Sequence, residues 1–90
     1  MKNGAINIAI VDDHQIVIDG IKSLLEDQPG FRIVACTTSP QHMLELLNSQ
    51  PVDILLTDIM MPEMNGQELA KKVRKLFPGI KILALSMSGQ

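Results

Sequence analysis

The sequence is nearly free of aromatic residues. None of its 90 residues is Trp or Tyr and only two are Phe, although 46% are hydrophobic. Stacking of single-stranded nucleic acid uses aromatic platforms, so the composition argues against that mode of binding. The hydrophobic residues are therefore aliphatic, and they predict one small packed domain rather than a disordered chain. A chain of this size buries only roughly 60–65% of the surface that its unfolded form exposes.

Cysteine and positive charge are also scarce. Cys36 is the only cysteine, so neither an internal disulfide nor a cysteine metal cluster can form, and a reducing cytosol is the expected compartment. Eight Lys and Arg against ten Asp and Glu give a net charge of −2, which argues against direct nucleic-acid binding. The segment before Asp12 is too short for a signal peptide, and no apolar run is long enough to span a membrane. We therefore expect a cytoplasmic chain without a membrane contact.

Short apolar runs alternate with helical patterns along the whole chain. Strands are expected at residues 5–11, 31–37, 53–57 and 80–86. Helices are expected at residues 15–28, from Pro40 to the 48–51 segment, and from the Asn65 cap to Pro78. Their expected inner faces are Val17, Ile21, Leu24 and Leu25, then Met43, Leu46 and Leu47, then Leu69, Val73, Leu76 and Phe77. This alternation predicts an α/β fold with a parallel sheet and helices on both faces.

Carboxylates follow two of these expected strands. Asp12 and Asp13 end the first, and Asp58 ends the third. In a flavodoxin-like strand order 2-1-3-4 these two strands are neighbours, so the three acids would meet in the cleft where ligands bind in such folds. Three close carboxylates repel one another unless a cation joins them, and Mg²⁺ suits such oxygen ligands. One carboxylate could then attack a phosphoryl group, and Ser86, ending the fourth strand, could hydrogen-bond the product.

At these residues the sequence resembles the receiver domain of two-component response regulators. The matching segments are Ile-Val-Asp-Asp-His at 10–14, Leu-Thr-Asp-Ile-Met-Met-Pro-Glu-Met-Asn-Gly at 56–66, and Ile-Leu-Ala-Leu-Ser at 82–86. The second segment is the most specific, with proline four residues and glycine eight residues after the acid. The first segment looks most like regulators with a LuxR-type helix-turn-helix output. The resemblance covers essentially the whole chain.

The resemblance implies a role for each matching residue. It makes Asp58 the phosphoacceptor of a phosphoryl group from a histidine kinase, in a Mg²⁺-dependent reaction. The implied metal ligands are Asp12, Asp13, the Asp58 side chain and the backbone carbonyl of Met60. Ser86 would be the switch hydroxyl, and Pro62 and Gly66 would shape the loop after the phosphoacceptor. Asn65 stands where the family most often has Asp, and it caps a helix equally well. Such a domain promotes its own phosphorylation and hydrolysis but is not a turnover enzyme.

The sequence departs from the family in one larger respect. The family has a fifth strand ending in a lysine and two further helices, and no lysine here fits that role, since Lys81 opens its strand at the wrong end. We therefore expect residues 1–90 to form a single receiver domain truncated after the fourth strand, without an output domain. A fragment of this kind would keep its acidic site, fail to signal, and self-associate as a dimer through its open fourth strand and uncovered sheet face.

Each candidate residue also has a simpler explanation. Asp12 and Asp13 could be a solvated strand end or a helix cap, Asp58 a turn residue, and Ser86 polar surface. His14 suggests a metal ligand or catalytic dyad, but we favour an exposed residue at a helix start. His42 is expected to be exposed, and Cys36 buried. Met60, Met61 and Met64 are expected to pack in a loop, because the neighbouring ligands are hard oxygens. The basic run Lys71, Lys72, Arg74 and Lys75 fits a solvated helix face.

An enzyme of another class remains as an alternative. A Mg²⁺-dependent phosphatase on a similar sheet usually has a second acid two residues after the nucleophile, where this chain has Met60. A Toprim-like nuclease needs an Asp-x-Asp pair on the later strand, and that pair is absent. We therefore favour the phosphoacceptor over either enzyme, with turnover of p-nitrophenyl phosphate as the discriminating observation.

Overall fold

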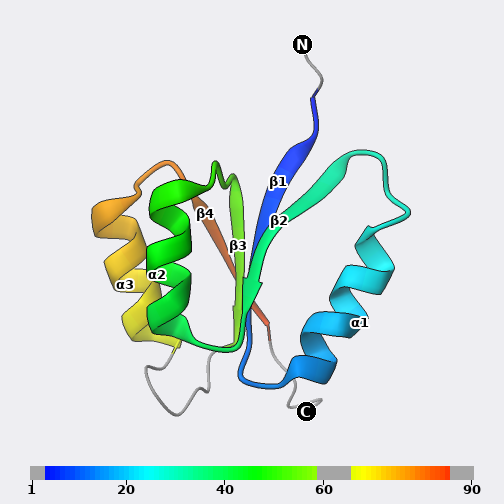
Figure 1. Ribbon diagram of the computed structural model, residues 1–90. Helices are drawn as coiled ribbons and strands as arrows, with labels where there is room; N and C mark the ends of the chain where they lie inside the picture. Colours follow the sequence, from blue (N-terminus) through cyan, green and yellow to red (C-terminus); the bar gives the residue numbers. More distant parts are fainter. Residues whose placement is uncertain (1–3, 59–65, 86–90) are drawn as a thin grey trace.

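The computed structural model describes residues 4–58 and 66–85, which form a parallel sheet with helices on both sides (Figure 1). The strands are β1 (Ile6–Val11), β2 (Phe31–Thr37), β3 (Ile54–Asp58) and β4 (Lys81–Leu85). The helices are α1 (Gln15–Leu25), α2 (Pro40–Ser49) and α3 (Gly66–Leu76). Within these ranges, no helix is long and apolar enough to cross a membrane.

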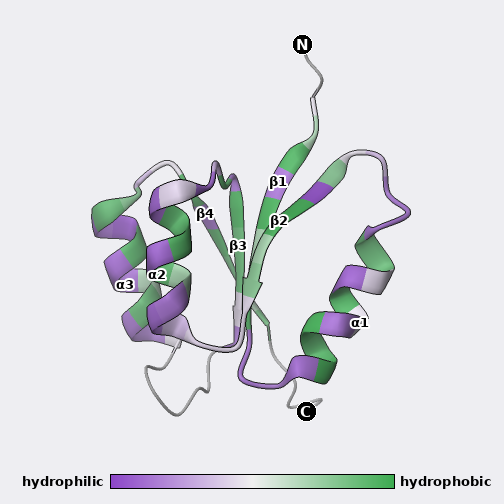
Figure 2. Ribbon diagram, viewed as in Figure 1, coloured by the Kyte–Doolittle hydropathy of each residue, from purple (hydrophilic) through white to green (hydrophobic). Residues whose placement is uncertain are grey.

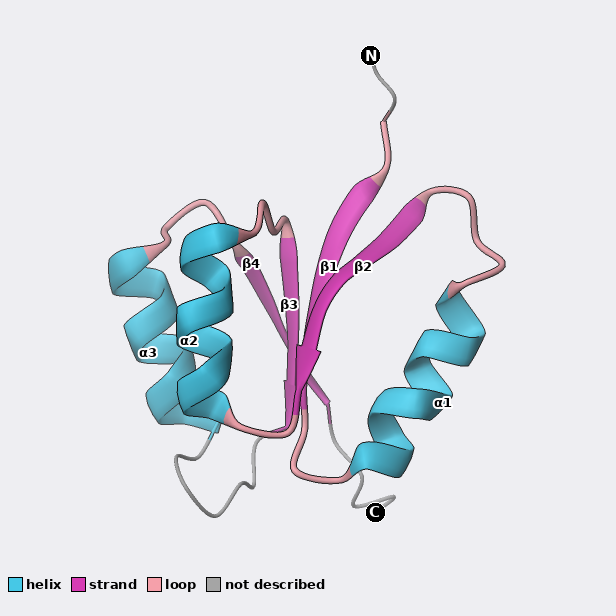
Figure 3. Cartoon of the chain, viewed as in Figure 1, coloured by secondary structure: helices cyan, strands magenta, loops and turns pink. Residues whose placement is uncertain are grey.

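The sheet has the order β2-β1-β3-β4, and all of its pairs are parallel, which confirms the predicted fold class. Helix α1 covers one face, while α2 and α3 lie side by side on the other, so the domain has three layers (Figure 3). Because β1 and β3 are adjacent at the centre, the residues that follow them share one edge of the sheet.

Two aliphatic clusters fill the spaces between the layers. The cluster under α2 and α3 consists of Ala9, Val11, Ala35, Met43, Leu47, Leu55, Leu69 and Val73. The cluster under α1 is smaller and consists of Ile8, Ile10 and Ile18, with half-buried neighbours around them. Burial of these side chains is the main stabilising contribution to the domain. Figure 2 shows apolar residues along the strands and on part of each helix.

The strand β2 contains one extra residue relative to β1. Ile8 pairs with Ile33, but the next residue, Ala9, pairs with Ala35. The register shift is a β-bulge that leaves Val34 opposite no residue of β1. It turns Cys36 toward the smaller cluster, where this free cysteine is half-buried rather than fully buried.

Several predicted boundaries were wrong by one to three residues. Helix α1 ends at Leu25, not residue 28, because the chain turns there: the Gln28 amide donates to the Leu25 carbonyl at 2.9 Å, and Pro29 has no N–H with which to continue a helix. Strand β3 begins at Ile54, after Asp53. The Asp53 amide donates to the Asn7 carbonyl at 2.8 Å, but the Asn7 amide donates to the Asp53 carboxylate at 2.8 Å instead of to a backbone carbonyl of β3. Strand β4 begins at Lys81, because Ile80 donates to the carbonyl of Phe77 in a turn.

Two leucines that were predicted to face the core are exposed. Leu24 exposes 74% and Leu76 60% of its surface. Helix α1 has apolar residues on most of its circumference, so spacing alone did not fix its inward side, and the buried residue is Ile18. In α3, Leu69 and Val73 are buried as predicted, and the same spacing of four residues leads to Phe77 rather than Leu76.

The predicted start of α2 is confirmed. The Ser39 hydroxyl accepts a hydrogen bond from the His42 amide at 3.2 Å, and Pro40 occupies the first helical position. The predicted cap of α3, Asn65, lies outside the described residues. The basic residues of α3 are exposed, as expected for a solvated face; they are Lys71, Lys72, Arg74 and Lys75.

Candidate functional site

The candidate site lies where β1 and β3 end at the same edge of the sheet. Val11 pairs with Thr57 in the parallel register, and each is the last residue before a carboxylate. Asp12 follows β1, and Asp58 is the final residue of β3. Hydrophobic burial of both strands fixes this register, because a slip by one residue would move their apolar side chains to the opposite faces.

Asp12 is fully buried at this edge. Its Oδ1 accepts the backbone N–H of His14 at 2.8 Å, which tightens the turn between β1 and α1. Its Oδ2 has no hydrogen-bond partner among the described residues and is itself inaccessible. A buried polar atom without a partner costs about 1–3 kcal/mol, so this oxygen favours a ligand that can satisfy it.

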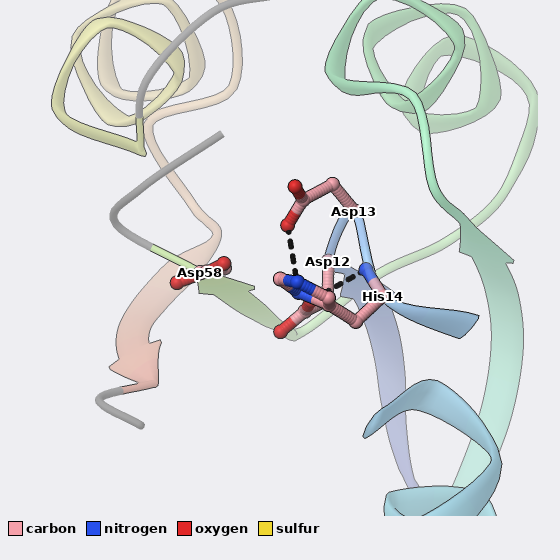
Figure 4. Close-up of side chains that lie close together, drawn as sticks. All are labelled: Asp12, Asp13, His14 and Asp58. Atoms are coloured by element: carbon pink, nitrogen blue, oxygen red, sulfur yellow. Dashed lines mark hydrogen bonds and ion pairs between the residues drawn. The ribbon is translucent and has the colours of Figure 1, made fainter. Parts of the chain in front are cut away.

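The imidazole of His14 lies over the acidic pair. Its Nδ1 is 3.2 Å from Asp12 Oδ1 and 3.0 Å from Asp13 Oδ1 (Figure 4). The first contact has hydrogen-bond geometry, whereas Asp13 Oδ1 has no such bond within the described part of the chain. The His14 side chain is 62% exposed, so the ring forms the solvent side of the cluster.

The Asp58 carboxylate completes the cluster from β3. Asp58 is buried, with 6% of its surface exposed, and its backbone carbonyl accepts the Thr57 hydroxyl at 3.0 Å. One potential ligand atom from each of Asp12, Asp13, His14 and Asp58 lies within 4.8 Å of the others. Figure 4 shows Asp58 at the end of β3, opposite the other three side chains.

The donor set fits a divalent cation. Three carboxylates within this distance repel one another when ionised, and a cation between them removes the repulsion. Oxygen ligands from two or three carboxylates are those that Mg²⁺ takes in proteins, and the unpartnered Asp12 Oδ2 is available to supply one. Asp12, Asp13 and Asp58 are thus the described carboxylates that could hold the ion.

The same negative charge acts on His14. Its hydrogen bond to Asp12 raises the pKa of the imidazole above 6.5, and the nearby charge of Asp13 raises it further. Both causes favour the protonated ring, because a positive charge is stabilised beside carboxylates. When the ring is protonated, it therefore partly balances the charge of the cluster.

The structure brings together three of the residues predicted from the sequence, namely Asp12, Asp13 and Asp58. Gly66 is buried as the first residue of α3. Met60, Pro62 and Ser86, for which a carbonyl ligand, a loop-shaping role and a switch hydroxyl were predicted, lie outside the described residues.

His14 is the residue whose position the sequence reasoning missed. It is exposed at the start of α1, as predicted, but its ring turns back over the acids instead of extending into solvent. The signal was its place directly after two acids at a strand end, where the tight turn keeps neighbouring side chains together.

Comparison with known proteins gives one consistent family. Residues 8–90 match the family described as response regulator receiver domain. The chain is 37% identical over 82 residues to the transcriptional regulatory protein DegU of Brevibacillus brevis, covering 91% of this chain and 35% of DegU. It is 32% identical over 82 residues to the response regulator UvrY of Escherichia coli K12, covering 91% of this chain and 38% of UvrY. The chain thus spans just over a third of the length of these curated relatives.

Solved structures agree. The non-phosphorylated receiver domain of the stress response regulator RcsB from Escherichia coli superposes with a TM-score of 0.87 at 29% identity, covering 96% of this chain and 68% of that one. The RcsB response regulator of Salmonella typhimurium gives a TM-score of 0.88 at 29% identity, covering 96% of this chain and 44% of that one. With the family match over nearly its full length, the chain belongs to the response regulator receiver domain family.

Proposed function

We propose that this chain is a phosphoacceptor in two-component signalling, with Asp58 as the residue that takes the phosphoryl group. The observation that carries the proposal is the position of Asp58 at the end of β3, buried and within 4.8 Å of ligand atoms from Asp12 and Asp13. Membership of the receiver family supports the same role. A histidine kinase is the proposed phosphodonor.

The chemistry is a transfer between two nucleophiles. An oxygen of the Asp58 carboxylate attacks phosphorus, the new P–O bond replaces the P–N bond of a phosphohistidine, and the departing imidazole nitrogen takes up a proton. When bound by Asp12, Asp13, Asp58 and the Met60 carbonyl, Mg²⁺ would offset the negative charge that builds on the phosphoryl oxygens. We assign Ser86 as the switch hydroxyl, and Pro62 and Gly66 as the residues that shape the loop between Asp58 and α3.

The donor must reach Asp58 past the rim of the cluster. Helix α1 begins at this rim, and Ile16 in its first turn exposes 81% of its surface. An exposed large apolar side chain beside a reactive group favours a protein donor that covers it. We therefore assign the first turn of α1 to the contact with the kinase.

The chain's output is proposed from its relatives. DegU carries the name of a transcriptional regulatory protein, and RcsB has been solved in complex with DNA, where this chain covers 43% of the RcsB chain. We propose that the protein regulates transcription in the cytoplasm, and that the region described here does not itself bind DNA. Its net charge of −2 supports that division of roles.

We also propose that the chain is not a turnover enzyme. One relative is named protein-glutamate methylesterase/protein-glutamine glutaminase 3, from Shewanella oneidensis, and the chain covers 24% of its length at 34% identity. The phosphatase alternative predicts repeated hydrolysis of p-nitrophenyl phosphate, whereas a phosphoacceptor modifies itself once per cycle. Sustained release of p-nitrophenol that depends on Asp58 would favour the enzyme.

Phosphorylation is tested by intact-mass measurement after incubation with acetyl phosphate or phosphoramidate. We expect a mass increase of one phosphoryl group with Mg²⁺, and none with EDTA. The Asp58→Asn variant should not gain the group, whereas Asp27→Asn, which changes an exposed acid in a turn, should behave like the wild type. A gain that persists in Asp58→Asn would contradict the proposal.

A second candidate function is self-association through β4. Strand β4 is the edge of the described sheet, and Leu83, on the face away from α2 and α3, exposes 46% of its surface. An open apolar edge is a template for pairing with another strand. Light scattering at micromolar concentration should then give a dimer, and Leu83→Lys should weaken it, while Leu24→Lys on α1 should not. A monodisperse wild-type monomer would contradict this candidate.

A further inference from the structure

His14 places a ring nitrogen where a cation held by the acidic pair would meet it. Nδ1 lies 3.2 Å from Asp12 Oδ1 and 3.0 Å from Asp13 Oδ1, and it is the ring atom that faces the carboxylates (Figure 4). Asp12, Asp13, His14 and Asp58 form the group of four potential ligand residues. The imidazole therefore lies close enough to the carboxylates to share a cation with them.

The local backbone holds the ring in this position. His14 occupies the N-cap of α1, where a side chain commonly accepts a hydrogen bond from the helix, but its ring makes no such bond. Instead, its own amide donates to Asp12 Oδ1 at 2.8 Å, which closes the turn and keeps the side chain beside the acids. The turn thus fixes Asp12 and His14 relative to each other before any ion binds.

A second observation points independently to a bound ligand. Asp12 Oδ2 belongs to a fully buried side chain and has no hydrogen-bond partner among the described residues. A cation at the cluster would satisfy this oxygen, and the mixed set of carboxylates and one imidazole would then decide which cation fits best.

We propose that His14 is a specificity-determining metal ligand, whose Nδ1 makes this acidic site prefer imidazole-binding divalent cations of the first transition row, such as Co²⁺ and Ni²⁺, over Mg²⁺. The inference rests on the proposed function in so far as that function requires a cation at the cluster. Neutral imidazole with its proton on Nε2 has a lone pair on Nδ1 and coordinates such ions well. Mg²⁺ prefers oxygen and water, so the ring adds nothing to its binding.

Isothermal titration with Co²⁺ and with Mg²⁺, each alone, tests the proposal on the wild type and on His14→Ala. For His14→Ala we expect Co²⁺ affinity to fall at least about tenfold and Mg²⁺ affinity to stay the same. A tenfold loss is the minimum, because even removal of a residue that only hydrogen-bonds a metal ligand weakens metal binding by that factor. The visible spectrum of bound Co²⁺ should also change on loss of the nitrogen ligand. His42→Ala removes an exposed histidine whose ring contacts Thr37 and which does not belong to the group of four potential ligands, so it should leave both affinities unchanged.

The outcomes are separable. Equal Co²⁺ affinity in the wild type and His14→Ala would overturn the proposal, and so would a rise in the affinity for both ions, which would identify the ring as a competitor of the cation. Binding of neither ion by the wild type would instead contradict the metal dependence of the proposed function. His14 is exposed, so His14→Ala should fold, and circular dichroism of the variant before titration checks this.

Discussion

Val11 and Thr57 are register partners across the centre of the sheet, and the residue after each is an aspartate. This pairing is what turns two acidic strand ends, 46 residues apart in sequence, into one cluster. The strands are held in register by the aliphatic residues beneath them, among which Ile10 and Leu55 are fully inaccessible. The chemistry of the site therefore depends directly on the packing of the core.

The packing of α1 depends on one residue. Ile18 is fully buried in the small cluster between α1 and the sheet, so Ile18→Ala should lower the free energy of unfolding by about 2–5 kcal/mol. Ile16 is two positions away in the same helix and largely exposed, so Ile16→Ala should change stability by less than about 0.5 kcal/mol. Urea denaturation followed by circular dichroism measures both. Equal losses would show that the inward side of α1 has been misassigned.

The protonation of His14 should follow the charge of its neighbours. Because the pKa of the ring is raised in the folded protein, protonated His14 stabilises the fold below about pH 6.5, and this contribution is lost as the pH rises through the raised pKa. The NMR shift of the ring C2 proton should titrate with a midpoint above 6.5 in the metal-free protein. Asp12→Asn and Asp13→Asn should each bring the midpoint down, and a wild-type midpoint at or below 6.5 would contradict the geometry.

Metal binding should appear as thermal stability. At a Mg²⁺ concentration of about ten times Kd, binding stabilises the folded state by about 1.4 kcal/mol, which raises Tm by several degrees in a domain of this size. Asp12→Asn should lose this increase while melting no lower than the wild type in EDTA, since it removes one of three mutually repelling charges. Differential scanning fluorimetry with and without EDTA makes the comparison. An unchanged Mg²⁺ response in Asp12→Asn would exclude that residue as a ligand.

Transfer from a kinase should depend on a surface that small donors do not use. The kinase to use is the histidine kinase that phosphorylates the wild type fastest. With this kinase, Ile16→Glu should slow phosphotransfer by about tenfold, because the interface loses one apolar anchor. Its reaction with acetyl phosphate should be unchanged. Leu24→Glu is the matched control, because Leu24 is similarly exposed but about 12 Å further along α1. Equal rates in all three proteins would remove the first turn of α1 from the contact.

The sequence was sufficient to predict the order of elements, the parallel sheet and the residues that converge at its edge. Strand ends marked by Asp12 and Asp58 are unambiguous because buried aliphatic runs stop at them. Helix phase was harder, since α1 carries apolar residues on several sides, and Leu24 was wrongly placed inward. The side of such a helix that faces the core is set by its packing against the sheet, and the spacing of its apolar residues does not reveal that side.

The position of His14 shows a similar limit within the site. Exposure at a helix start was predicted and is observed, but the direction of the ring is set by the turn in which Asp12 accepts the His14 amide. The bulge at Val34, which rephases Cys36, is likewise a feature of strand pairing that no single strand reveals. Sequence patterns therefore do not predict the direction of a side chain when a turn or the register of strand pairing sets that direction.

Asp58 is the residue proposed to carry the phosphoryl group. Borohydride reduction of the phosphorylated chain converts an aspartyl phosphate to homoserine, and peptide mapping then locates the modified residue. We predict homoserine at position 58 after reaction with acetyl phosphate and Mg²⁺, and none at positions 12 or 13. Homoserine at position 12 or 13, or its formation at full yield in EDTA, would contradict the assignment of Asp58 as the Mg²⁺-dependent phosphoacceptor.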